Sequence, residues 1–329
     1  MSPLLGDSAA MQRLRRQLGR VAPTPLSVLI QGETGTGKDL IAGQLHALSE
    51  RPGELITVDC AGISAGVLES ELFGHVRGAF TGATQDRDGL VVAAHQGTLF
   101  LDEVGELPPS TQTRLLRLID TATVRPVGSD TTRKVDLRIV AATWQPLQIQ
   151  VQQGVFRRDL YHRLDVISLT APPLRDRRDD IDTLLDHFLE AEARSMNTAP
   201  VRLTGQARRS LRRWPWPGNV RELKNVARYL TAMTQGQADV ADLPARLRTP
   251  IPALDDSASA SIRTDLPYLE ARRLWLDQFQ VAYVRAILEE HGGNASAAAR
   301  ASGLDRRTIQ RIRSRAAAKI IDPESMSTD

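Results

Sequence analysis

LSVLIQGETGTGKDL spans residues 26–40 and decides the fold of the first part of the chain. The apolar run LSVLI predicts a buried strand, and a glycine-rich turn then leads into a helix expected to begin near Asp39. Backbone N–H groups of such a turn can surround phosphates, and the helix N-terminus adds positive potential. The turn therefore predicts a nucleotide site formed by Gly32, Glu33, Thr34, Gly35, Thr36, Gly37, Lys38 and Asp39.

LFLDE, residues 99–103, is the second element that such a site requires. The apolar run ends in two carboxylates, and ligands of open parallel sheets lie at the C-terminal ends of the strands. Asp102 is the candidate ligand of Mg²⁺, and Glu103 is the candidate base that orients and deprotonates an attacking water. The loop and the two acids together predict ATP and Mg²⁺ as cofactors.

Short apolar runs alternate with helical stretches from residue 26 to about 170, and LRIVAAT at 137–143 is a further buried strand. This alternation predicts an α/β fold with a parallel sheet. From about 175 to 246 the strand signal vanishes and helical periodicity takes over. We expect four parts: an α/β core at 1–172, a helical lid subdomain at 173–247, a linker at 248–267 and a C-terminal unit at 268–329.

The composition excludes several classes of protein. One cysteine, Cys60, cannot form an intrachain disulfide framework or a multi-cysteine zinc site. No stretch approaches the roughly 20 apolar residues that a membrane helix needs, and the start lacks the apolar core of a signal peptide. The sequence therefore predicts a folded cytoplasmic protein without a membrane partner.

GAFTGA at residues 78–83, preceded by ELFGH at 71–75, carries a resemblance to a known family. Together with the nucleotide elements it resembles the central AAA+ domain of bacterial enhancer-binding proteins, the activators of RNA polymerase that carries sigma-54. The resemblance covers roughly residues 4–246 and includes PPLR at 172–175 and WPGNVREL at 216–223. It implies an AAA+ P-loop ATPase with a helical lid, and sigma-54 contact by Gly78, Ala79, Phe80, Thr81, Gly82 and Ala83.

The resemblance also implies residues that complete the nucleotide site. Arg157 and Arg163, within FRRDLYHRL at 156–164, take the positions of arginines that act on the site of a neighbouring subunit. Arg221 takes the position of an arginine that touches the nucleotide, and Thr143 that of a sensor threonine. The family expectation is a self-associated ring, expected as a hexamer, in which hydrolysis depends on assembly.

Three residues depart from the family pattern. Asp39 stands where a Glu is usual, Asp59 replaces an Asn that hydrogen-bonds the catalytic glutamate, and Trp144 replaces an Asn after the sensor threonine. An ionised Asp59 cannot donate that bond and would repel Glu103. We therefore hypothesise that the subunit hydrolyses ATP weakly, or works best in a mixed ring with a homologous subunit.

The C-terminal unit predicts a small all-α DNA-binding domain. Residues 300–319 hold six arginines and one lysine against one acid. Upstream, a helix over 269–290 is expected to carry one apolar face, formed by Leu276, Phe279, Tyr283 and Ile287. HGG at 291–293 ends it, and shorter helices are expected at about 295–301 and 305–316.

NASAAAR at 294–300 and GLDRRTIQR at 303–311 resemble the Fis-type helix-turn-helix that usually ends these activators. The second short helix would enter a major groove. The DNA-binding candidates are Asn294, Ser296, Arg306, Arg307, Thr308, Gln310 and Arg311. Pairing of two such units through the helix at 269–290 would suit two-fold enhancer sites.

The leading interpretation is a sigma-54-dependent activator that couples ATP hydrolysis to remodelling of closed polymerase complexes and binds enhancer DNA. The alternative is a DNA- and sigma-binding regulator that binds ATP with weak or no hydrolysis. A third interpretation, an AAA+ chaperone or unfoldase, is disfavoured by the GAFTGA loop and the helix-turn-helix.

Because the resemblance begins at residue 4, we expect no N-terminal regulatory domain and control by a trans-acting regulator.

Overall fold

A computed structural model describes residues 4–248 except residue 63, and residues 268–312 except residues 293, 303, 306 and 307. The chain divides into two compact units, Met1–Thr249 and Pro250–Asp329. In the described part of the chain, no helix is long and apolar enough to cross a membrane. Of the predicted linker at 248–267, only residue 248 lies within the described residues.

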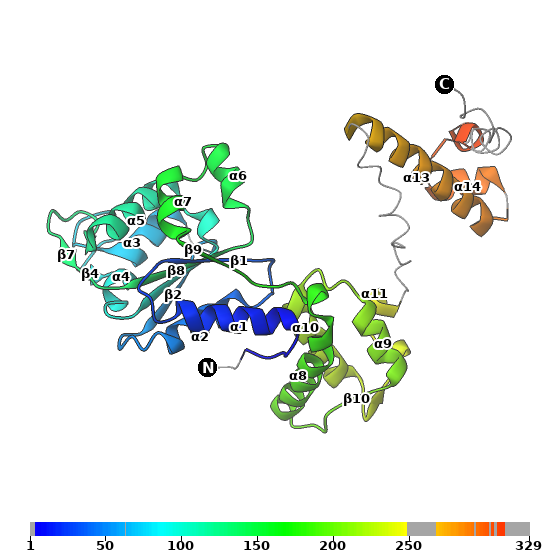
Figure 1. Cartoon of the computed structure of the whole chain (residues 1–329), viewed down its shortest axis with the longest axis horizontal. Coiled ribbons are helices and arrows are strands. Elements are labelled where there is room, and N and C mark those ends of the chain that lie inside the picture. Colours follow the sequence, from blue (N-terminus) through cyan, green and yellow to red (C-terminus); the bar gives the residue numbers. More distant parts are fainter. Residues whose placement is uncertain are drawn as a thin grey trace. The chain divides into compact units, whose positions relative to one another are not determined.

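A five-stranded parallel sheet forms the centre of the first unit (Figure 1). Its strands lie in the order β2-β5-β8-β1-β9. Their bounds are β1 (Val28–Gln31), β2 (Leu55–Asp59), β5 (Thr98–Asp102), β8 (Arg138–Thr143) and β9 (Ile167–Thr170). The predicted strands at 26–30, 97–103 and 137–143 are confirmed with small differences in bounds. Because all five strands run in one direction, β1, β5 and β8 present their C-terminal ends at the same edge.

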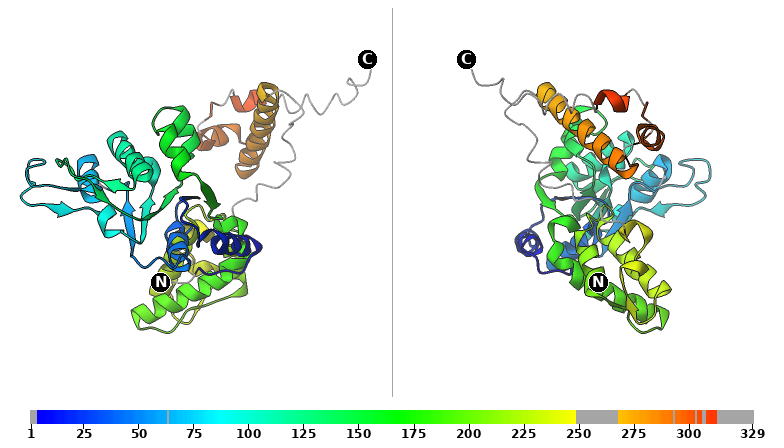
Figure 2. Two further views of the ribbon diagram at one scale, coloured as in Figure 1. Left: turned by 60° about the vertical axis from the view of Figure 1, so that its left-hand side comes forward. Right: turned by 90° about the vertical axis from the view of Figure 1, so that its right-hand side faces the viewer.

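Helices cover both faces of this sheet (Figures 1 and 2). Val28 and Ile30 pack into the layer of α1 (Ala9–Val21) and α2 (Lys38–Leu48), whereas Leu29 packs into the opposite layer. Successive strand residues point to opposite faces, so a strand covered on both sides is apolar at nearly every position. The second layer contains α3 (Ala65–Phe73), α4 (Leu90–Ala93), η1 (Val104–Glu106), α5 (Pro109–Thr121), α6 (Leu147–Gln152) and α7 (Arg158–Leu164).

Two short antiparallel strand pairs extend from the second layer. One joins β3 (Gly74–His75) to β4 (Arg87–Asp88), and the other joins β6 (Thr123–Val124) to β7 (Arg133–Lys134). His75 also forms a parallel bridge with Val127, which lies between β6 and β7. These pairings bring the base of the GAFTGA segment against the loop between β6 and β7.

The lid has its own hydrophobic core around the fully buried Trp216. Its elements are η2 (Leu174–Asp176), η3 (Arg178–Asp180), α8 (Ile181–Met196), α9 (Gly205–Arg213), α10 (Asn219–Met233), η4 (Val240–Asp242) and α11 (Ala245–Arg248). The prediction that strands are absent from this region is wrong. β10 (Arg202–Leu203) pairs in parallel with β11 (Gln237–Ala238), and strands of two residues are too short to show a period-2 pattern.

The second unit contains α13 (Tyr268–Glu290), α14 (Ala295–Ser302) and helical residues 308–312. Its core joins Val284 to Ala298, Ile309 and Ile312. Of the predicted apolar face of the first helix, Ile287 borders this core, whereas Leu276, Phe279 and Tyr283 are exposed. The exposure follows from length, because α14 is much shorter than α13 and, among the described side chains, those of α13 that join the core lie in its C-terminal part.

Candidate functional site

The phosphate loop at residues 32–38 connects β1 to α2, which begins at Lys38. The Gly32 N–H donates to the carbonyl oxygen of Thr143 at 3.2 Å, so the candidate sensor threonine at the end of β8 fastens the start of the loop. Lys38 is buried, and its Nζ donates to the Gly32 carbonyl at 3.1 Å. Asp39 is exposed in the first helical turn, where an acid favours the helix N-terminus.

Glu103 lies directly opposite this lysine. Lys38 Nζ is 3.1 Å from Glu103 Oε1, and the other carboxylate oxygen accepts the backbone N–H of Trp144 at 3.1 Å. Glu103 itself has φ of 52°, an uncommon left-handed conformation for a residue other than glycine. The candidate base is therefore held by the phosphate-loop lysine and by the end of β8.

Three carboxylates gather at the ends of β2 and β5, where Asp59 is the register partner of Asp102. Burial raises the pKa of Asp102, and the charge of Glu103 raises it further while Lys38 opposes the shift. Burial and the same three acids raise the pKa of the Cys60 thiol to about 12. Negative charge is therefore concentrated where a cation would be favoured.

The donor set at this edge fits Mg²⁺ that is shared with a nucleotide. Among the described residues, no group of three or more His, Cys, Asp or Glu side chains has an arrangement that could hold a metal ion by itself. Mg²⁺ usually retains waters and binds one or two carboxylates together with substrate phosphates. Asp102, at the end of β5 beside the phosphate loop, suits that arrangement.

Two of the three departures from the family pattern, Asp59 and Trp144, lie at the strand ends around Glu103. Asp59 Oδ1 accepts the Ala61 N–H at 3.0 Å, and in the described part of the chain no hydrogen bond joins Asp59 to Glu103. The Trp144 side chain is 55% exposed, so its indole is not packed into the site. Trp144 contacts Glu103 through its backbone N–H, and any residue except proline would supply that group.

The lid contacts the phosphate loop through residues whose role the sequence did not predict. Asn219 is fully buried, and its Nδ2 donates to Glu33 Oε2 and to the Thr34 carbonyl, both at 3.1 Å. Its Oδ1 accepts the Leu174 N–H at 2.8 Å. Arg175 grips both Glu33 oxygens at 2.8 and 2.6 Å, which lowers the pKa of Glu33. The sequence did contain a sign of these contacts, because Arg175 in PPLR and Asn219 in WPGNVREL are polar residues beside apolar residues and prolines.

Arg221 lies at the start of α10, directly against the loop. The backbone N–H groups of Val220 and Arg221 both point to the Gly35 carbonyl, at 2.9 and 3.3 Å. Gly35 has φ of +79°, and a Cβ there would lie 2.4 Å from the Gly218 carbonyl oxygen. Only glycine allows this approach of lid and loop, which holds the exposed Arg221 next to the phosphate site.

The two candidate neighbour-acting arginines lie on the surface at α7. Arg157 Nε and Nη2 donate to the Asp159 carboxylate at 3.0 and 2.7 Å. Arg163 Nε is 3.0 Å from Asp120 Oδ1, and both arginine side chains are about half exposed. Among the described residues, no hydrogen bond or ion pair joins either guanidinium to the phosphate loop of the same chain.

The GAFTGA segment forms an exposed turn with a fixed base. The Gly78 N–H donates to the Ala83 carbonyl at 2.9 Å, and Phe80 packs edge-on against His75 with ring centroids 5.0 Å apart. Gly78, Phe80, Thr81 and Gly82 are exposed, Ala79 is half-buried and Ala83 is buried. The exposed part of this turn is therefore the aromatic and hydroxyl tip.

The DNA-binding candidates are spread over two helices of the second unit. Asn294 caps α14, since its Oδ1 accepts the N–H groups of Ser296 and Ala297 at 3.1 and 3.2 Å. Thr308 is half-buried, whereas Gln310 and Arg311 are exposed. Arg306 and Arg307 lie outside the described residues.

The first unit thus combines a parallel α/β core, a phosphate loop with an opposing acidic strand end, and a helical lid, which defines the class of AAA+ nucleotide-binding proteins. Three family models match in succession: the sigma-54 interaction domain at residues 4–170, the AAA+ ATPase lid domain at 175–260, and the bacterial regulatory protein, Fis family, at 276–312.

Individual relatives agree with these matches. The chain is 42% identical over 309 residues to the transcriptional regulatory protein ZraR of Escherichia coli K12, covering 93% of this chain and 67% of that one. It is 47% identical over 252 residues to the regulator NtrC of Klebsiella pneumoniae, covering 76% and 54%. A crystal structure of NtrX from Brucella abortus with ADP superposes with a TM-score of 0.70 at 35% identity, covering 94% and 68%.

The chain belongs to the family of sigma-54-dependent transcription activators, with a Fis-type DNA-binding unit. The predicted resemblance and fold class are therefore confirmed.

Proposed function

We propose that this chain binds ATP and Mg²⁺ at the phosphate loop and couples hydrolysis to remodelling of closed complexes of sigma-54 polymerase. The observation that carries the proposal is the Lys38–Glu103 pair, which joins a phosphate-binding cation to a candidate base in one contact. NtrX from Brucella abortus, a relative of similar fold, has been crystallised with ATP and with ADP, which supports nucleotide binding here.

Nucleotide binding would change the partners of Glu103. The β- and γ-phosphates attract Lys38, so the ion pair with Glu103 is exchanged for contacts with phosphate. Glu103 keeps the Trp144 N–H and gains a free oxygen to accept a proton from water. Asp102 would hold Mg²⁺, which neutralises phosphate charge when bound.

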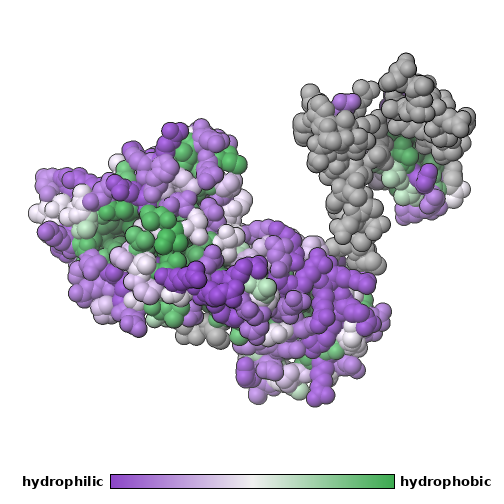
Figure 3. All heavy atoms as spheres, viewed as in Figure 1, coloured by the Kyte–Doolittle hydropathy of each residue, from purple (hydrophilic) through white to green (hydrophobic). Residues whose placement is uncertain are grey.

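Ring assembly would bring in the remaining cations. Arg157 and Arg163 are exposed and pair with the acids Asp159 and Asp120 of their own chain, so a neighbouring nucleotide could replace these acids as their partner. Self-association is also supported by apolar side chains on the surface of the core. Figure 3 shows hydrophobic residues gathered over the core and a mainly hydrophilic lid. By exposed area, the large apolar side chains on the surface of the core include those of Val67, Trp144, Ile149 and Val155.

The turn around Phe80 and Thr81 is the proposed contact with the sigma factor. A tip that offers one ring and one hydroxyl suits a partner surface, and its base is tied to the loop between β6 and β7, because the Val76 N–H donates to the Val127 carbonyl. The base of the turn is therefore held by the core while the tip is left exposed to a partner.

The second unit would bind enhancer DNA as a pair. Trp275, Phe279 and Tyr283 stack along one exposed side of α13, with successive ring centroids 5.9 Å apart. Pairing through this surface would place two helix-turn-helix units on a two-fold site. The proposed location is the cytoplasm, where sigma-54 polymerase and promoter DNA are found. We propose that a separate, trans-acting regulator controls the activity of this chain.

The second candidate function is an activator subunit that binds ATP but hydrolyses it weakly. It is favoured by the lack, among the described residues, of a hydrogen bond between Asp59 and Glu103. Such a subunit would depend on a mixed ring with a relative that carries an Asn at this position.

Steady-state ATP hydrolysis across protein concentration, measured together with open-complex formation on sigma-54 polymerase, separates the two functions. We expect turnover per subunit to rise cooperatively with concentration and to support open complexes. Nucleotide binding without turnover at any concentration would reject the homomeric motor and leave the mixed ring.

A further inference from the structure

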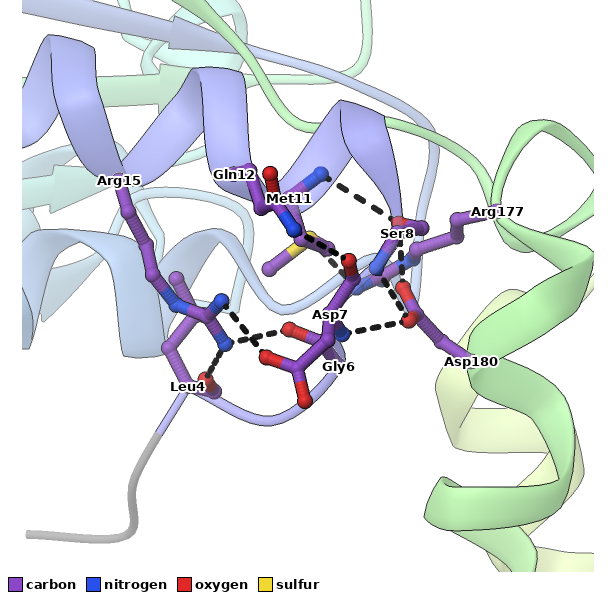
Figure 4. Close-up of polar contacts among 9 residues, drawn as sticks. All are labelled: Leu4, Gly6, Asp7, Ser8, Met11, Gln12, Arg15, Arg177 and Asp180. Atoms are coloured by element: carbon purple, nitrogen blue, oxygen red, sulfur yellow. Dashed lines mark hydrogen bonds and ion pairs between the residues drawn. The ribbon is translucent and has the colours of Figure 1, made fainter.

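The segment before α1, residues 4–8, is fastened to the start of the lid; we call it the strap (Figure 4). The Asp180 carboxylate accepts the N–H groups of Asp7 and Ser8 at 2.7 and 2.8 Å and the Ser8 hydroxyl at 2.6 Å. Asp180 is only 2% exposed. A buried carboxylate with three donors is a strong and specific attachment, because breaking it leaves a charge unsolvated.

The strap fits closely against this carboxylate. Gly6 has φ of +108°, and a Cβ on it would lie 2.5 Å from Asp180 Cγ. From the other side, the Arg15 guanidinium donates to the carbonyls of Leu4 and Gly6 (Figure 4). The strap is therefore held between the first helix and the lid.

Arg177, three residues before Asp180, connects the same turn to the phosphate loop. Its Nη2 donates to the Thr36 carbonyl at 3.0 Å, and its Nη1 reaches Met11 Sδ at 3.0 Å. The side chain is 4% exposed, and its Nε has no hydrogen-bond partner. One turn of chain thus touches the strap, the first helix and the loop that would surround phosphate.

We propose that Arg177 and Asp180 are positioning residues that couple docking of the strap to nucleotide binding. A nucleotide would order the loop around Thr36, which stabilises Arg177 and with it the turn that presents Asp180 to the strap. Coupling between two binding events is reciprocal, so a docked strap must strengthen nucleotide binding by the same factor. The inference rests on the nucleotide site of the proposed function but not on hydrolysis.

The test uses the full chain with Gly6→Ala and Asp180→Ala, and Gly19→Ala as the matched control. Gly19 lies in the same N-terminal region, and a Cβ there meets nothing within 4 Å. The measurements are titration with a fluorescent ATP analogue and hydrogen exchange of the Asp7 and Ser8 amides. We expect about tenfold weaker binding for the two strap variants, in the usual range of coupling between sites, and no change for Gly19→Ala.

Hydrogen exchange distinguishes coupling from loss of stability. In the wild-type chain the analogue should slow exchange of both amides, and in Gly6→Ala this response should be lost. Where turnover is measurable, KM should rise while kcat at saturating ATP is unchanged. If Asp180→Ala fails to fold, Gly6→Ala leaves the amino-acid sequence of the lid unchanged and tests the same contact from the side of the strap.

Two outcomes would overturn the coupling. One is that Gly6→Ala binds the ATP analogue with wild-type affinity, and the other is that the analogue does not change hydrogen exchange of the Asp7 and Ser8 amides in the wild-type chain. A wild-type chain that binds the analogue without hydrolysing it contradicts only the proposed activity, since affinity and exchange still report on the strap. A wild-type chain that binds no nucleotide rejects both proposals.

Discussion

The Glu103 carboxylate has two partners. Phosphate can attract Lys38 away from it, whereas the backbone N–H of Trp144 stays in place. Gln at this position keeps the size and can still accept a hydrogen bond, but it cannot take a proton from water. We expect Glu103→Gln to bind ATP and to lose about 10²- to 10⁴-fold in turnover, the usual contribution of a general base. Phosphate release and nucleotide titration check this, with the exposed Glu106→Gln as control. Undiminished turnover would remove Glu103 as the base.

Asp102 is predicted to reduce the stability of the nucleotide-free protein. Burial and the charge of Glu103 raise its pKa, so the folded state holds the proton more tightly than the unfolded state. The associated stability is present below the ordinary aspartate pKa of about 4 and is lost as pH rises through the raised folded value. Asp102→Asn should therefore melt at a higher temperature at neutral pH, with a gain that shrinks on acidification. A lower melting temperature at neutral pH would contradict this.

At the scale of elements, Asn219 joins α10 to both the phosphate loop and the entry of the lid. Replacement by Ala leaves the buried Leu174 N–H without a partner and places Ala at φ of 51°, which disfavours it. We expect a loss of about 1–3 kcal/mol in the free energy of unfolding, together with weaker nucleotide binding. Denaturant titration compares it with Asn225→Ala, an exposed position on the same helix. Equal stability of the two variants would show that the contact is dispensable.

The GAFTGA turn is an element with separate tip and base. Thr81 is exposed at the tip, whereas the hydrogen bonds of the base involve Val76, Gly78 and Ala83. Thr81→Ala should retain ATP hydrolysis and lose open-complex formation, and the nearby exposed Thr84→Ala should retain both. Joint loss of hydrolysis and activation would argue against a contact role for the tip.

For the whole molecule, the decisive prediction concerns subunits in a ring. Arg157→Ala keeps Glu103 but cannot supply its arginine, and Glu103→Gln has the opposite defect. An equal mixture should regain roughly a quarter of wild-type turnover, because half the sites keep Glu103 and half the neighbours keep Arg157. Turnover no higher than the mean of the two separate variants would mean that the arginine acts within its own chain.

The nucleotide elements, the central strands and the main lid helices could be predicted from short stretches of sequence. The phosphate loop, LFLDE and LRIVAAT are contiguous, and a central strand covered on both faces is apolar along its length. β10 and β11 could not be predicted, since two residues carry no period. The apolar side of α13 could be predicted from helical periodicity, but periodicity does not indicate which part of that side a short neighbouring helix covers.

Local chemistry in the sequence was thus sufficient for the fold class, the family resemblance and the candidate residues at the ends of β1 and β5. Only the tertiary structure revealed that Glu103 pairs with Lys38, that Asn219 binds Glu33, and that Asp180 holds the strap. Glu33 and Asn219 are 186 residues apart, and Asp7 and Asp180 are 173 residues apart. No local pattern encodes such contacts, because they arise where separate elements meet and desolvate polar groups that then require partners.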